Sequence, residues 1–414
     1  MAPIPRSVDL IVVEEAQLLS AGLFDFLARQ KASIVFFSDV YQALQPGKAK
    51  LEHQQHTLSQ RAHTLKLCES LRFGPSVASL CSALAHKSGN ASREWVRGSG
   101  KSAVYDHKRR SVWEQQGQHY TVLAANHVTL FKEALEATIR GRVVTWLNGI
   151  ESHPVALLRD LIVLSMGRDD GYRASTGHSP IETPSLRNTP SLGALLERYQ
   201  QQPYHLISQL GQWICRQTSP GLLRIVDGWR KADAARQAHY QRQINVPLPR
   251  DLTLGTVQQA QGHEWPRVAV ADDLFPMVLC DHNWHVAPDS QRVVNLAYTA
   301  ISRAQRGVAV PAMFLAHLNA HGWDLPDNNP NIEIDPEVGE GTADRQWHTH
   351  FGMDRQARLE LTPTARRSLQ ALPSGRALST RQSGHERIRE KLETDAEINH
   401  ASGPADLRAA LRRR

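Results

Sequence analysis

The sequence predicts an α/β protein whose strands form parallel sheets. Short apolar segments, such as residues 9–16 and 32–39, alternate with longer segments that repeat apolar residues at helical spacing. The strand-like segments are apolar along most of their length, which is typical of parallel strands whose two faces are covered by helices. The connections between them are short, and this favours helices packed directly on the sheet.

The predicted elements follow one another in a regular order. A helix at 17–30 separates the first two strands, and a polar stretch at 45–63 precedes a helix with Pro75 in its first turn. The sequence then predicts a strand and a helix within 118–139, a strand at 141–150, mainly helix over 151–250 around a Ser/Thr/Pro/Gly-rich loop at about 167–191, strands at 251–260 and 266–274, a helix at 295–305 and a strand at 307–314. Beyond Gly322 the apolar periodicity weakens, and we expect a partly disordered tail with a helix around 383–397.

Length and composition restrict the class of protein. The chain has 414 residues, enough for two or three domains that each bury a core. No apolar run reaches the roughly 18 residues that span a bilayer, and the first residues lack the pattern of a signal peptide. We therefore expect a soluble, cytoplasmic protein without a membrane partner. The net charge of +7 is compatible with a polyanionic partner. The cysteines are far apart and indicate neither a zinc site nor a disulfide framework; they are Cys68, Cys81, Cys215 and Cys280.

Two adjacent carboxylates, Glu14 and Glu15, end the first predicted strand. Acids at the carboxyl end of a buried strand are where an α/β sheet holds a magnesium-bound nucleotide. Taken alone, such a pair also fits the N-terminus of a following helix, where the helix dipole stabilises negative charge. Residues further along the chain favour the first interpretation.

Five segments occur in a characteristic order along the chain. They are VVEEAQLL (12–19), FFSDVYQAL (36–44), SLRFGPSVASLC (70–81), TVQQAQGHEWPRVAVADDL (256–274) and NLAYTAISRAQRGVAV (295–310). This series resembles the later motifs of superfamily 1 DNA helicases of the UvrD/Rep type, and most closely the F-box DNA helicase branch. The resemblance covers about residues 8–320. It implies RecA-like parallel sheets, ATP and Mg²⁺ as cofactors, and 3′ to 5′ movement on single-stranded or partly duplex DNA.

The resemblance also implies roles around the nucleotide. Glu14 stands where the family has the Asp of the Mg²⁺ shell, and Glu15 stands where it has the Glu that polarises the attacking water, so both are candidate metal ligands. Asp39 and Gln42 match a motif whose Gln reads the γ-phosphate. Ser38 replaces the Gly of that motif.

Two arginines complete the set of catalytic candidates, which is Glu15, Gln42, Arg72 and Arg303. In the family, the arginines at the positions of Arg72 and Arg303 reach the γ-phosphate from the second motor domain. A guanidinium suits this role because its planar fork meets phosphate oxygens in pairs.

A further motif connects the nucleotide to DNA. Its Gly262 and Glu264 are expected on the nucleotide side, whereas Thr256, Gln258 and Gln259 are expected beside the DNA backbone. The family has His and Lys where this chain has Gln258 and Gln259. Glutamines still donate hydrogen bonds, but they release no counterions from DNA.

No segment of the sequence matches the phosphate loop GxxxxGK[ST], which in the family lies well before the first of these motifs. We therefore expect a remnant of the first motor domain at 1–64 and a second motor domain at 65–150 and 246–325, with a helical insertion resembling domain 2B at 151–245 and a basic tail at 326–414. The two strands of the remnant should expose an apolar edge and face. The partner that this predicts is an upstream polypeptide supplying the missing motor half.

Three interpretations of function remain open. The chain is part of a split or mis-started helicase, a degenerate helicase-like protein that binds DNA or a partner without turnover, or an interaction module in which the motor domain is only a scaffold. Arginines of the tail, such as Arg366 and Arg412, either contact phosphates or belong to a solvated segment with interleaved acidic residues.

Overall fold

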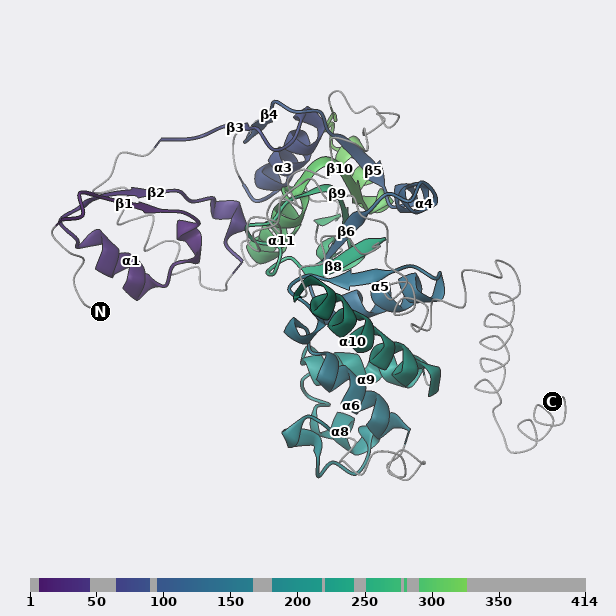
Figure 1. Ribbon diagram of the computed structural model, residues 1–414. Helices are drawn as coiled ribbons and strands as arrows, with labels where there is room; N and C mark the ends of the chain where they lie inside the picture. Colours follow the sequence, from purple (N-terminus) through teal and green to yellow (C-terminus); the bar gives the residue numbers. More distant parts are fainter. Residues whose placement is uncertain are drawn as a thin grey trace. The chain divides into compact units, whose positions relative to one another are not determined.

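The computed structural model describes residues 7–44, 65–89, 95–166, 181–217, 220–241, 251–276, 279–280 and 290–325 (Figure 1). The chain divides into two compact units, Met1–Leu223 with Pro249–Asp354 and Arg224–Leu248 with Arg355–Arg414. All the described strands lie in the first unit, and the described part of the second is the later portion of helix α10.

The described strands are β1 (Leu10–Val13), β2 (Ser33–Phe36), β3 (Glu69–Ser70), β4 (Arg97–Gly98), β5 (Ala103–Asp106), β6 (Tyr120–Ala124), β7 (Val144–Trp146), β8 (Leu252–Thr256), β9 (Trp265–Val270) and β10 (Ala304–Val310). The described α-helices are α1 (Ala21–Ala28), α3 (Pro75–Lys87), α4 (Lys108–Gln115), α5 (His127–Ile139), α6 (Val155–Ser165), α8 (Leu192–Arg198), α9 (Leu206–Gln217), α10 (Pro220–Gln241), α11 (Gln291–Ile301) and α12 (Ala312–Ala320). Short 3-10 helices are η1 (Ala16–Leu18), η2 (Val40–Gln42), η3 (Ile150–Ser152), η4 (Pro184–Leu186) and η5 (Asp272–Leu274).

A six-stranded, entirely parallel sheet organises the larger part of the first unit. Its strand order is β5-β10-β9-β6-β8-β7, so strands that are far apart in the sequence become neighbours (Figure 1). Helices α3 and α11 pack on one face, whereas α4 and α5 pack on the other. The predicted α/β fold with RecA-like parallel sheets is therefore confirmed.

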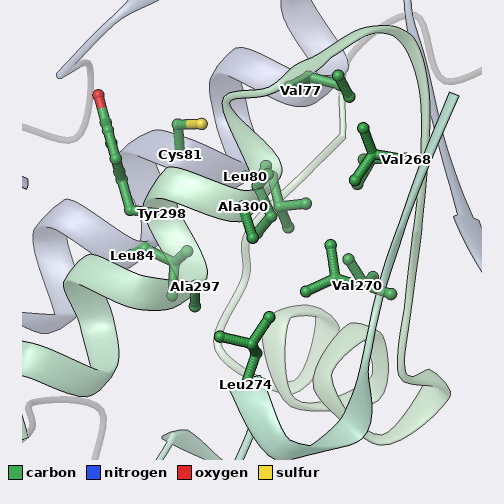
Figure 2. Packing of buried hydrophobic residues seen from close by; sticks show 14 of the residues in the cluster. Val77, Leu80, Cys81, Leu84, Val268, Val270, Leu274, Ala297, Tyr298 and Ala300 are labelled. Carbon is green, nitrogen blue, oxygen red and sulfur yellow. The ribbon is translucent and has the colours of Figure 1, made fainter. Parts of the chain in front are cut away.

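The main core lies between the sheet and the pair α3–α11. Figure 2 shows Leu80 and Leu84 of α3 meeting Ala297 and Ala300 of α11, with Val268 of β9 to their right. Alternate strand residues point to this core, because side chains of a strand alternate between its faces. The opposite face therefore carries its own row of side chains, where α4 packs on β5 and α5 packs on β6, β7 and β8.

A second, two-stranded parallel sheet joins β1 and β2, with Leu10 paired to Ser33 and Val12 paired to Val35. Helix α1, capped by Ser20, packs on one face, where Phe24 stacks on Phe36 at 5.1 Å between ring centroids. The other face is exposed: Leu10 is 55% accessible, Val12 54%, Val35 41% and Phe37 46%. The predicted exposed apolar face is confirmed, and it is unusual because parallel strands are ordinarily covered on both sides.

The segment after β2 leaves this small sheet and packs into the main core. Tyr41 and Leu44 are buried there, and the Tyr41 ring lies 5.3 Å from the ring of Tyr298 and 5.0 Å from that of Trp95. Asn295 of α11 donates hydrogen bonds to the carbonyls of Val40 (3.4 Å) and Ala43 (2.8 Å). Residues 40–44 are thus part of the body built by the six-stranded sheet.

The described residues within 151–245 are mainly helical, as the sequence predicted, and α6, α8 and α9 pack against one another. Asp160 of α6 is fully buried and accepts hydrogen bonds from the backbone N–H groups of Glu182 (2.9 Å) and Thr183 (2.6 Å). A carboxylate that accepts several backbone donors stabilises the turn that returns the chain to these helices.

Other expectations were wrong in detail. The strand expected at 307–314 ends at Val310, because Pro311 fixes its own φ and begins α12. Elements β5 and α4 were not predicted, since α4 has a polar sequence and buries only Trp113. Of the loop expected at about 167–191, residues 167–180 lie outside the described residues, as do the tail and its expected helix at 383–397. In the part of the chain that the structure describes, helices are either too short or too polar to cross a bilayer.

Candidate functional site

Arg303 lies at the centre of the candidate site, in the turn between α11 and β10. Arg303 is buried, with only 1% of its surface accessible to solvent. The guanidinium donates to the carbonyls of Thr299 (3.3 Å) and His263 (3.4 Å) and to the side-chain oxygen of Gln42. All of these acceptors are neutral, so the positive charge of Arg303 has no ion-pair partner among its described contacts.

The electrostatic setting of Arg303 follows from this burial. Loss of hydration, and next the charge of Arg72, lower the pKa of Arg303 to about 10. The carboxylates of Glu15 and Asp39 raise this pKa in part, without forming an ion pair with Arg303 among the described residues. A buried guanidinium that is still charged at neutral pH is therefore held near a second cation, which is a costly arrangement unless an anion joins them.

Arg72 approaches from the turn that precedes α3. Its Nε atom donates to Glu264 Oε2 at 2.5 Å, and its Nη1 atom donates to the carbonyl of Ser302 at 3.0 Å. Gln305 donates to the other carboxylate oxygen of Glu264 at 2.9 Å. About a third of the Arg72 side chain remains accessible. Glu264 thus orients Arg72, and its partner Gln305 was not singled out from the sequence.

Gln42, held by Asp39, contacts Arg303 from the segment that follows β2. Gln42 donates to Asp39 Oδ2 at 3.0 Å, and the Tyr41 N–H donates to Asp39 Oδ1 at 3.0 Å. Burial raises the pKa of the Asp39 carboxyl, while the hydrogen bonds from Gln42 and Tyr41 lower it in part. Gln42 therefore has both ends fixed, its amide nitrogen by Asp39 and its oxygen by Arg303.

Gln17 connects Asp39 to Glu15, which follows strand β1 of the small sheet. Its side-chain nitrogen donates to Glu15, and its side-chain oxygen accepts from the Asp39 N–H at 3.3 Å. Gln17 is 4% accessible. It was not assigned a role from the sequence, although it stands within the VVEEAQLL segment that carried the resemblance.

Glu15 has a left-handed backbone conformation, with φ 53° and ψ 41°. A non-glycine residue in this region is uncommon and strained, and the Glu15 carboxylate accepts a hydrogen bond from Gln17. Glu14 is exposed. Among the described residues, no group of three or more His, Cys, Asp or Glu is arranged to hold a metal ion. Two carboxylates with free oxygen positions do suit Mg²⁺ that takes its other ligands from phosphate and water.

The predicted DNA-contacting residues lie at the carboxyl end of β8. Gln259 accepts hydrogen bonds from the Thr256 N–H and hydroxyl, both at 3.0 Å, and donates to Ser152 Oγ at 3.0 Å. Gln258 is exposed. Gly262 has φ +78°, which favours glycine, and it forms the turn that places Glu264 beside Arg72. Thr256 and Gln259 are thus hydrogen-bonded to each other, whereas the exposed side chain of Gln258 can contact a ligand.

Residues 98–102 read GSGKS, the final letters of a phosphate loop, yet they have a different structure. They end β4 and lead into β5, with no helix following. The Ser102 hydroxyl accepts from the N–H groups of Gly74 (3.0 Å) and Val77 (3.4 Å), so it caps helix α3. A Cβ at Gly74 would lie 2.2 Å from the carbonyl oxygen of Gly100. Gly74 and Gly98 therefore allow the backbone before α3 to pass close to the backbone after β4.

Comparison with known proteins adds a direct finding. The chain matches no protein-family model. It is 23% identical over 338 residues to F-box DNA helicase 1 of Gallus gallus, in a match that covers 75% of this chain. The chain spans 30% of the length of that relative. This similarity and the RecA-like α/β fold support a relationship between this chain and DNA helicases.

Proposed function

We propose that this chain is the arginine-bearing part of a helicase-like, ATP-dependent DNA motor of the UvrD type. In this role Arg303 and Arg72 bind the γ-phosphate, Gln42 senses it, and Glu15 orients the attacking water. Glu14 and Glu15 would hold Mg²⁺, which supplies charge neutralisation at the transferring phosphoryl group. The relative named above is a DNA helicase, and DNA is accordingly the proposed substrate.

The observation that carries this proposal is the buried, unneutralised guanidinium of Arg303. Its hydrogen bonds end on neutral oxygens, and Arg72 lies near enough to lower its pKa. Arg72 is held by Glu264 but keeps part of its side chain accessible. Two guanidinium groups of this kind suit a phosphate that carries more than one negative charge.

The exposed face of the small sheet supports a second element of the proposal, a partner segment that carries the phosphate loop. Leu10, Val12 and Val35 form an apolar face that helices or strands of another segment would cover. Such a segment would place its loop at the carboxyl end of β1, next to Glu14 and Glu15. DNA translation upstream of Met1 tests this cheaply, because an in-frame GxxxxGK[ST] would identify the segment.

The decisive experiment is ATP hydrolysis with and without single-stranded DNA. The chain is assayed alone and joined to any such upstream segment, and Glu15→Gln is the control for contaminating hydrolysis. We expect DNA-stimulated turnover in the joined protein, with loss in Glu15→Gln and in Arg303→Met. Turnover that survives in both variants would show that the proposed site is not the one that acts.

A non-catalytic DNA- or protein-binding module is the alternative. It is favoured by Gln259 and Thr256, which satisfy each other and leave Gln258 as the exposed member of the predicted DNA-contacting set. Binding of single-stranded DNA that does not change with nucleotide, together with no turnover in the joined protein, would support this alternative.

A further inference from the structure

A group of unpaired polar atoms lies on the face of the six-stranded sheet opposite the main core. Buried side-chain atoms without a hydrogen-bond partner include the hydroxyl of Tyr105 and the Nε atoms of Arg109 and Arg267. Tyr105 is 4% accessible and Arg267 is 8% accessible. Buried polar atoms normally find a partner, so three that gather in one place call for a specific explanation.

The sheet register brings these residues together. Val104, Val308 and Val268 point into the main core, so Tyr105 of β5 and Arg267 of β9 point to the other face. The strand between them, β10, presents Gly307 and Ala309 there, because Gly307 pairs with Arg267 and Ala309 pairs with Tyr105. Small residues leave room above β10 for the two long side chains to converge.

Helix α4 supplies the second guanidinium. Arg109 lies over the Tyr105 ring, with 4.9 Å from its Cζ atom to the ring centroid. Trp113, one turn later, packs edge-on against the same ring at 5.7 Å. The neighbouring Arg110 is different, because it forms an ion pair with Glu133. Arg109 and Arg267 form no ion pair with a carboxylate in the described part of the chain.

The charge balance identifies what is missing. Burial lowers the pKa of Arg267, and the charges of Arg306 and Arg109 lower it further, against a raising effect of Tyr105. Both guanidinium Nε–H groups are donors only, and the Tyr105 hydroxyl can also donate. The group therefore lacks an acceptor with negative charge. A single carboxylate would leave positive charge over, whereas a phosphate carries about −1.5 to −2 at neutral pH.

We propose that Tyr105, Arg109 and Arg267 form a phosphate-binding site on the α4 side of the six-stranded sheet. The phosphate accepts hydrogen bonds from the two guanidinium groups and from the phenol. It belongs either to a free phosphate compound or to a nucleic-acid backbone, which present the same oxygens.

Calorimetric titration of the full chain tests this site. The two probes are inorganic phosphate and a short single-stranded oligonucleotide without terminal phosphates, in metal-free buffer at constant chloride concentration. No ATP is present in either titration, so the result does not depend on whether the Arg303 site hydrolyses ATP. The variants are Arg267→Met, Arg267→Lys and Arg109→Gln. Lys108→Gln is the matched control, since it removes one exposed positive charge from the same helix.

At the site of Tyr105, Arg109 and Arg267 we expect one phosphate, in addition to any phosphate bound at Arg303. The Kd of this site should rise about tenfold or more in Arg267→Met and Arg109→Gln, and by less than about twofold in Lys108→Gln. Arg267→Lys should bind with intermediate affinity, because it keeps the charge and loses the fork. If phosphate alone does not bind, oligonucleotide binding that weakens in Arg267→Met but not in Lys108→Gln assigns the site to a nucleic-acid backbone.

The thermal midpoint separates a binding role from a purely structural one. Without phosphate, Arg267→Met should unfold at the same or a higher temperature than the natural chain, because it removes a buried unpaired charge. Should it fail to fold, Arg109→Gln and Arg267→Lys still measure the site. Binding of both probes that is equal in the natural chain and these variants, or binding of neither probe by the natural chain, would overturn the proposal.

Discussion

Replacing Arg303 by methionine should leave the protein as stable as before or make it more stable, although the residue is almost completely buried. Burial, with the nearby charge of Arg72, lowers the pKa of Arg303 from its ordinary value to about 10. A difference of this size corresponds to about 3 kcal/mol against the charged form in the folded state. Methionine has a similar length and no charge, so the variant escapes this cost.

The hydrogen bonds of Arg303 oppose this gain. The carbonyls of Thr299 and His263 and the side-chain oxygen of Gln42 each lose a donor in the variant. The first two contacts are long, at 3.3 and 3.4 Å, and each lost bond costs about 0.5–1 kcal/mol. The sum for the three bonds is about 1.5–3 kcal/mol, which leaves a net change between about zero and 1.5 kcal/mol in favour of methionine.

Urea unfolding at neutral pH, followed by circular dichroism, measures this difference. Arg303→Ala is the matched variant, and it should be less stable than Arg303→Met by about 2 kcal/mol or more because it leaves a cavity. The folded-state pKa of Arg303 is below the unfolded one, so the cost is fully present at neutral pH. It is lost as the pH rises through about 10 towards the higher pKa of the unfolded chain. A loss of more than about 3 kcal/mol in Arg303→Met would refute the reasoning, because the guanidinium would then be a structural support.

Three other predictions follow from the described contacts. Amide hydrogens of β1 and β2 should exchange faster than those of β6 and β9 by about a hundredfold or more, since one face of the small sheet is open to water; equal protection measured by mass spectrometry would contradict this. Burial lowers the pKa of His153 to about 4, so stability should fall as the pH drops from about 6.5 towards 4, by at most about 3 kcal/mol, and His153→Leu should reduce that slope in urea titrations. Asp273 accepts from the N–H groups of Ala125 and Asn126, so Asp273→Asn should cost about 1–3 kcal/mol, with an unchanged midpoint counting against this role.

Sequence patterns predicted the elements whose physical signals are local. Pro75 begins α3 as expected, because a proline suits the first helical turn. The ordered motifs also anticipated a long-range result, since Gln42 and Arg303 are hydrogen-bonded across 261 positions of the chain. Their roles with nucleotide remain predictions.

Other parts of the molecule could not be predicted because their signals are not local. The cluster of Tyr105, Arg109 and Arg267 depends on the register of three strands and on a polar helix without apolar periodicity. The letters GSGKS at 98–102 resemble the end of a phosphate loop, but the backbone crossing at Gly74 decides their structure. A short motif fixes a site only when its neighbours in space are also known.

The packing of Tyr41 and Leu44 has a practical consequence for dividing this protein into fragments. A fragment that begins at residue 65 would lose both side chains and leave a hole beside Tyr298 and Trp95. A fragment that begins near residue 38 would keep Tyr41 and Leu44 in the core and would lack β1 and β2, the strands with the exposed apolar face. The second fragment should therefore aggregate less and suit crystallisation better. Its boundary nevertheless falls inside the segment FFSDVYQAL (36–44).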